Sequence, residues 1–141
     1  MRWSVVPLAL SLSIGCRPSY EPPAPILTLM PAAMRVAGAT ATGDGHTRCL
    51  VAGASVEAIV YIHQPTAAII VTAFTTTPDA IPGLVVRLGS LTIASSAIRN
   101  TKAEVSVYRA RMGRGEQVLQ LIVPEGSPGV VCLDQVAVTQ P

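Results

Sequence analysis

The sequence is short of aromatic and charged residues, and these shortages exclude several classes of protein. Aromatic residues make up 4% of the 141 residues and charged residues 13%, against about 25% charged residues in an average domain. The ten Lys and Arg residues are scattered, and the formal net charge is only +2. Because no basic stripe is present to follow a phosphate backbone, we expect no nucleic-acid partner.

The chain also lacks the residue groups that catalysis requires. It has no Gly-x-Ser-x-Gly turn, and its eight acidic residues are too dispersed to predict the carboxylate pair of a glycoside hydrolase. The two histidines, His46 and His63, fall in or beside predicted turns. Asp44 and His46 share a glycine-rich loop and are candidates for a weak ion or ligand site. We therefore assign no catalytic residue and expect no enzymatic activity.

Prolines and glycines, 12 and 11 in number, separate short apolar segments. In residues 55–62 apolar side chains recur at every second position, which predicts a half-buried strand. Residues 67–74 form a continuous apolar run rich in β-branched residues, which is typical of a central strand. We expect Phe74, at the end of this run, to pack in the core.

Further strands are predicted over residues 84–88, 91–93, 103–108, 117–123 and 130–138. Their spacing, with no helical period of useful length, predicts an all-β fold. We expect an antiparallel β-sandwich or jelly roll of about eight or nine strands.

The polar faces of the predicted strands hold two tyrosines. Tyr61 and Tyr108 both fall at such positions, so each is a candidate to bind a ligand or to pack across strands. The sandwich is expected to span residues 34–141. Residues 26–33 are either an edge segment or a continuation of the linker before it.

The N-terminus has the order of a secretory signal. Arg2 supplies a positive charge, residues 3–12 are mostly apolar, and small or apolar residues precede Cys16. The apolar stretch is shorter than the ~20 residues of a membrane-spanning helix. The sequence therefore predicts an exported protein, and an ordinary signal peptide in which Cys16 has no role is the alternative.

Residues 12–16 (LSIGC) resemble the lipobox of bacterial lipoproteins, in which the cysteine carries a lipid. Ile14, Gly15 and Cys16 fit that motif, and Ser13 stands where leucine is usual. The resemblance implies a signal peptide over residues 1–16 and lipidation at Cys16. Residues 17–33 would be a proline-rich, extended tether. It also implies anchoring to the outer membrane or cell surface, facing the periplasm or the exterior.

The lipobox accounts for one of the three cysteines. Cys49 and Cys132 remain, and an oxidising compartment would allow them to form a disulfide. Two buried free thiols are the alternative. A metal site is not expected, since no Cys-x-x-Cys and no nearby histidine pair is present.

A second family resemblance is carried by residues 60–65 (VYIHQP), 68–73 (AIIVTA), 84–91 (LVVRLGSL), 115–123 (GEQVLQLIV) and 131–138 (VCLDQVAV). In this order they resemble galactose-binding-like β-sandwiches, and in particular the calcium-dependent xylan-binding type of carbohydrate-binding module. The resemblance implies a β-sandwich that binds a glycan without catalysis.

The calcium ligands of that family are largely missing here. Residues 35–39 offer no carboxylate where the family has an acidic first strand, and residues 124–129 supply only Glu125. Asp134 would stand alone, whereas calcium takes about six to eight oxygen ligands. We therefore expect no metal and no other cofactor.

These observations predict a non-catalytic envelope lipoprotein whose β-sandwich binds a glycan or another envelope component. The alternative is a structural or protein-interaction module that has lost the sugar site. The missing carboxylates and the scarcity of aromatic residues favour this alternative.

Cys16→Ala is expected to release the protein from the membrane fraction into the soluble periplasm or medium, because the change removes the lipid acceptor. Cell fractionation and fatty-acid labelling measure the effect, with Ser19→Ala as the control. A Cys16→Ala protein that stays in the membrane fraction, together with an unlabelled parent protein, contradicts the lipid anchor.

Overall fold

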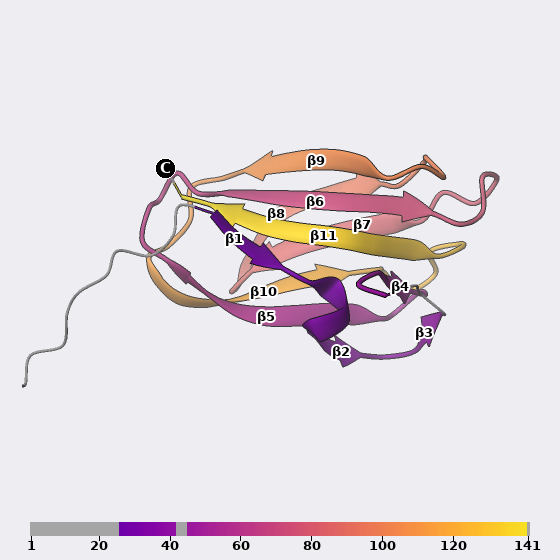
Figure 1. Cartoon of the computed structure of the whole chain (residues 1–141), viewed down its shortest axis with the longest axis horizontal. Helices are drawn as coiled ribbons and strands as arrows, with labels where there is room; N and C mark the ends of the chain where they lie inside the picture. Colours follow the sequence, from indigo (N-terminus) through magenta and orange to yellow (C-terminus); the bar gives the residue numbers. More distant parts are fainter. Residues whose placement is uncertain (1–25, 42–44, 141) are drawn as a thin grey trace, which may run out of the picture.

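Alternating apolar residues and frequent turns fold the chain into two antiparallel sheets that face each other (Figure 1). The computed structural model describes residues 26–41 and 45–140. Sheet A consists of β1 (Ile26–Leu29), β3 (Thr40–Ala41), β4 (Arg48–Leu50), β6 (Ala68–Thr75), β9 (Glu104–Arg109) and β11 (Val131–Thr139). Sheet B consists of β2 (Arg35–Ala37), β5 (Ser55–Ile62), β7 (Gly83–Leu88), β8 (Leu91–Ala97) and β10 (Gly115–Ile122).

The strand order differs strongly from the chain order. Sheet A runs β3-β4-β11-β6-β9, and β1 pairs with β11 on the same edge as β4. Sheet B runs β2-β5-β10-β7-β8. A short 3-10 turn, η1 (Pro31–Ala33), joins β1 to β2. The first and last strands of the described chain therefore lie side by side.

The all-β sandwich predicted from the sequence is confirmed, although the described residues form eleven strands instead of eight or nine. Seven of them correspond to strands located in the sequence, and the other four, β1 to β4, have only two to four residues each. Segments this short carry no readable alternation, which is why the sequence pattern did not predict them as individual strands. β1 lies within the range assigned to the tether, and the division of the chain into tether and domain otherwise remains a prediction.

The core lies between the sheets and is built from every second residue of the long strands. On β5, Val56, Val60 and Ile62 of the predicted inward set are buried, and the fourth member, Ala58, is half-buried against the core. Each buried side chain contributes roughly 1.5–3 kcal/mol through removal from water. Facing residues on the other strands complete this core, among them Ile69, Val71, Val86, Leu119, Leu121, Leu133 and Val136.

Strand β9 alternates as predicted, but with its polar residues turned toward the other sheet. Tyr108 is paired with Ile69 and Ser106 with Val71, both of which are inward residues of β6. Val105 and Val107, 62% and 47% exposed, point outward. Tyr108 is consequently half-buried against the edge of the core, and does not lie on an outer polar face as the sequence indicated.

Phe74 was expected in the core, and this expectation is wrong. Its register partner is Cys132, and both side chains lie on the outer face of sheet A. The neighbouring inward residues of β6, Ala73 and Thr75, are buried, whereas Phe74 is half-buried. A continuous apolar run carries no alternation, so the sequence did not reveal which face Phe74 occupies.

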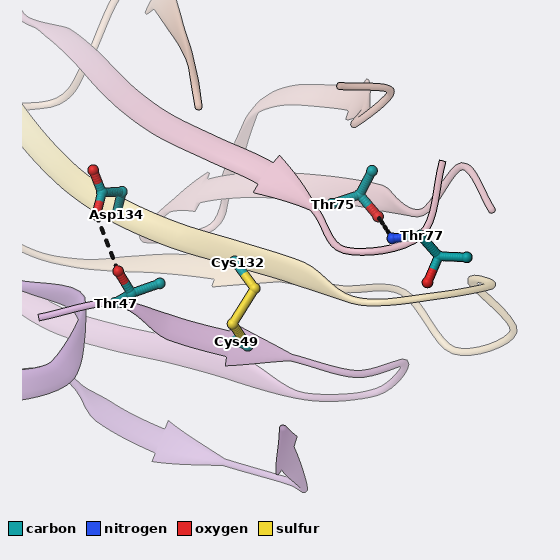
Figure 2. Close-up of a disulfide and its surroundings, with 6 residues drawn as sticks. All are labelled: Thr47, Cys49, Thr75, Thr77, Cys132 and Asp134. Atoms are coloured by element: carbon teal, nitrogen blue, oxygen red, sulfur yellow. Dashed lines mark hydrogen bonds between the residues drawn. A yellow bond between two sulfur atoms is a disulfide. The ribbon is translucent and has the colours of Figure 1, made fainter. Parts of the chain in front are cut away.

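The predicted disulfide between Cys49 and Cys132 is present, with an S–S distance of 2.06 Å (Figure 2). The two cysteines are direct cross-strand partners on β4 and β11, with their Cα atoms 3.9 Å apart. Both are buried, yet they lie outside the cluster of core residues, in a row with Phe74 on one side and Ala41 on the other. The bond closes a loop with a sequence separation of 83 that contains β5 to β10.

Replacing both cysteines, as Cys49→Ala with Cys132→Ala, is expected to lower the free energy of unfolding by about 4–5 kcal/mol. The physical reason is the entropy that a long unfolded loop regains when its ends are no longer joined. Urea denaturation with and without reductant measures the difference. The double variant should no longer respond to reductant, and a parent protein whose stability is also indifferent to reductant contradicts this role of the bond.

Candidate functional site

Tyr61 stands on the open outer face of sheet B. On β5 the even-numbered residues point into the core, so the odd-numbered residues Glu57, Ile59 and Tyr61 point outward. The Tyr61 side chain is 60% exposed, and its register partner on β10 is Glu116. An exposed aromatic ring beside a carboxylate is a suitable contact for a ligand with one apolar and one hydroxylated face.

Next to Tyr61 along the strands lies an apolar pair. Ile59 and Val118 are direct partners on β5 and β10, and they are 66% and 40% exposed. Together with Arg35, Glu57 and Ala58 they line an open hollow of about 320 Å³. The pair therefore extends the exposed surface of Tyr61 toward the middle of the sheet.

A row of polar residues crosses the sheet one step further along. Its members are Arg35, Glu57, Gln120 and Arg87, one from each of β2, β5, β10 and β7. Arg35 Nη1 lies 3.7 Å from Glu57 Oε1, and Gln120 Nε2 donates a hydrogen bond of 3.3 Å to Glu57 Oε2. Arg87 Nε is buried and has no hydrogen-bond partner among the described residues. We refer to Tyr61, Ile59, Val118 and this polar row as the sheet B face.

Tyr108 lies at a different place, in a narrow cleft along the edge between β8 and β9. The cleft has a volume of about 70 Å³, and its polar lining includes Ser96, Arg99, Glu104 and Ser106. Ligand pockets are usually about 300–1,000 Å³. The cleft can therefore hold a few water molecules or a single substituent of a ligand, and it does not meet the sheet B face.

His46 has a partner that sequence reasoning missed. Its Nε2 atom lies 2.7 Å from Asp134 Oδ1, and the same carboxylate oxygen accepts a 3.0 Å hydrogen bond from Thr47 Oγ1 (Figure 2 shows the Thr47 bond). Asp44, the predicted companion of His46, lies outside the described residues. Asp134 sits where the β11 register shifts between Leu133 and Gln135, and a bulge of this kind cannot be read from spacing.

Comparisons with known proteins find solved structures with a similar fold. The chain is similar to the CBM36-1 domain of a multidomain xylanase from the hindgut metagenome of Trinervitermes trinervoides. The TM-score is 0.73 at 13% identity, covering 82% of this chain and 98% of that one. It is also similar to a CBM36 carbohydrate-binding module in complex with calcium and xylotriose, with a TM-score of 0.67 at 14% identity, covering 79% and 97% of the two chains.

A family 35 carbohydrate-binding module from Clostridium thermocellum is similar as well, with a TM-score of 0.66, 12% identity and coverage of 84% and 100%. No protein-family model and no curated protein matches the sequence. The resemblance to carbohydrate-binding modules is therefore confirmed at the level of the fold.

The calcium bound by one of these modules prompts a test of the residues present here. Calcium takes about six to eight oxygen ligands, and within residues 26–41 and 45–140 no three His, Cys, Asp or Glu side chains are grouped to hold a metal. Asp134, the expected lone carboxylate of the last strand, is occupied by Thr47 and His46. The described residues thus do not fit a calcium site.

Asp134→Ala is expected to lower the free energy of unfolding by about 1–2 kcal/mol, because Thr47 loses a charge-assisted hydrogen bond in a half-buried position. His46→Ala is expected to cost less than about 1 kcal/mol, since its side chain is more than half exposed. Urea denaturation of both variants measures which change lowers the free energy of unfolding more. A neutral Asp134→Ala, or a larger loss for His46→Ala, contradicts this assignment.

Proposed function

We propose that this protein is a non-catalytic glycan-binding module, carried to the cell envelope as a lipoprotein through Cys16. The observation that carries the proposal is the exposed Tyr61 ring beside the Ile59–Val118 pair, on a fold similar to carbohydrate-binding modules. A glycan would lie along the sheet B face. No catalytic step is part of the proposal.

The chemistry of this face suits a sugar chain. The Tyr61 ring and the aliphatic pair offer apolar surface for the C–H faces of pyranose rings. Arg87 and Gln120 offer N–H donors to hydroxyl groups, while Glu57 and Glu116 offer acceptors. Because the face and its hollow are open to solvent, they would bind an extended chain instead of enclosing one sugar, and the affinity would be modest.

Tyr61→Ala is expected to weaken binding about tenfold, the usual effect of truncating a central aromatic contact. The measurement is affinity electrophoresis in gels that contain cell-wall or plant polysaccharides, xylan included, with and without EDTA. We expect EDTA to change nothing, because the described residues group no metal ligands.

Val105→Ala is the matched control, since Val105 is about as exposed as Tyr61 but lies on sheet A. If the Tyr61→Ala variant binds polysaccharide with unchanged affinity, the binding site does not lie on the sheet B face. Absence of binding to every polysaccharide refutes the glycan-binding function.

A second function is favoured by one specific observation, the outer edge of sheet A. β9 is the last strand of that sheet, and it carries the exposed Val105 and Val107. An edge of this kind can accept a strand from a partner protein, although the flanking Glu104 and Arg109 limit such pairing. Crosslinking in the native envelope distinguishes the two functions, because a structural module would capture a protein partner through β9.

A further inference from the structure

Three arginines gather at one end of the sandwich. Arg109 ends β9, and Arg111 and Arg114 lie in the loop to β10. All three are exposed, and none forms an ion pair with a described residue. Arg109 and Arg111 border an open hollow of about 590 Å³ whose other lining residues are Pro65, Thr66 and Ala110. We call Arg109, Arg111 and Arg114 the basic end.

The described chain begins at this same end. Arg109 pairs with Ala68 of β6, Ala68 pairs with Thr139 of β11, and Thr139 pairs with Ile26 of β1. Adjacent strands are about 4.8 Å apart, so Arg109 and Ile26 are separated by about 14 Å. Figure 1 shows the start of β1 and the ends of β9 and β11 together.

The opposite end carries charges of both signs. Its loops follow β6, β8 and β10, and they hold Asp79, Arg99, Lys102 and Glu125. At the basic end, Glu116 is the acidic residue that follows Arg114, and it faces Tyr61 on sheet B. Positive charge is therefore concentrated at the end where β1 begins.

The length of the chain between Cys16 and β1 limits the distance between the basic end and a lipid on Cys16. Ten peptide bonds (26 − 16) separate Cys16 from Ile26. A fully extended chain spans at most about 3.5 Å per residue, so Ile26 would lie within about 35 Å of the lipid-bearing residue. For the opposite end this upper limit is larger by the length of β11, about 30 Å for nine residues.

From this arrangement we infer that the basic end binds the anionic headgroups of the membrane in which the protein is anchored. The inference rests on the proposed lipid anchor for its choice of a membrane as partner. Each guanidinium group can bind two phosphate oxygens at once, and basic side chains close to a membrane surface are attracted to anionic headgroups. Docking at the basic end would also hold the sheet B face near the membrane, because Tyr61 lies at the same end of β5.

A tryptophan placed at one end of the sandwich or the other tests which end contacts the membrane. The sequence has one tryptophan, Trp3, which lies in the expected signal peptide and is absent from the processed protein, so each added tryptophan is a single reporter. Thr66→Trp puts the reporter beside the basic end and Asp79→Trp puts it at the opposite end, both at exposed positions. The processed protein, purified from the membrane fraction, is mixed with vesicles of brominated phosphatidylcholine, with or without phosphatidylglycerol. Fluorescence quenching reports contact with the membrane.

We expect phosphatidylglycerol to increase quenching at Thr66→Trp and not at Asp79→Trp. The added Arg111→Gln and Arg114→Gln changes should abolish the increase, as should about 0.5 M salt, which screens exposed charges. Arg99→Gln with Lys102→Gln, which removes the same charge from the other end, should leave the increase intact. Quenching that is equal at both ends, or unchanged in the Arg111→Gln, Arg114→Gln protein, overturns the inference.

The outcomes also separate this inference from the lipid anchor. A protein that does not sediment with neutral vesicles lacks the anchor, yet phosphatidylglycerol-dependent quenching at Thr66→Trp would still support a basic end that binds anionic lipid. A protein that sediments with neutral vesicles, but shows no effect of phosphatidylglycerol on quenching, is anchored and lacks the proposed contact.

Discussion

The pairing of β11 holds sheet A together, and much of the molecule depends on it. β6 occupies one edge of this strand, while β1 and β4 share the other edge end to end. All three neighbours come from far earlier in the chain, so the β3-β4 and β6-β9 pairs join into one sheet only when the last strand is in place. Contacts at such sequence distances cost loop-closure entropy before they contribute stability. The covalent bond from β11 to β4 removes part of that cost once it has formed.

Three kinds of sequence signal predicted the structure well. In β5 the alternation of apolar and polar residues was regular enough to give both the strand and its faces, including an outward Tyr61. The cysteines were predictable because one of three was assigned to the lipobox, which left Cys49 and Cys132 as a pair. Turns rich in proline and glycine set the limits of the longer strands, and hence the sandwich class.

The remaining features depend on tertiary contacts that a sequence does not display. In β9 the alternation was visible, but an edge strand can present either set of side chains to the core. The register with β6 places Tyr108 on the same side as the buried Ile69, and the sequence does not display that register. Phe74 ends an unbroken apolar run, and such a run does not indicate which face of the sheet its last side chain occupies. The pairing of Asp134 with His46 and Thr47 joins residues nearly ninety positions apart, across a strand irregularity that leaves no mark in the sequence.

The position of the disulfide also determines how the protein would respond to a pulling force. A load applied at the start of β1 reaches the chain ahead of Cys49, where β1 to β3 can be peeled from their neighbours one pair at a time. Cys49 is bonded to Cys132, so tension passes directly to the last strand and bypasses the loop between them. β5, β7, β8 and β10 all lie inside that loop. The strands that carry Tyr61, Ile59 and Val118 are thereby outside the covalent path of that load, whereas Arg35 on β2 lies in the part that can be peeled away.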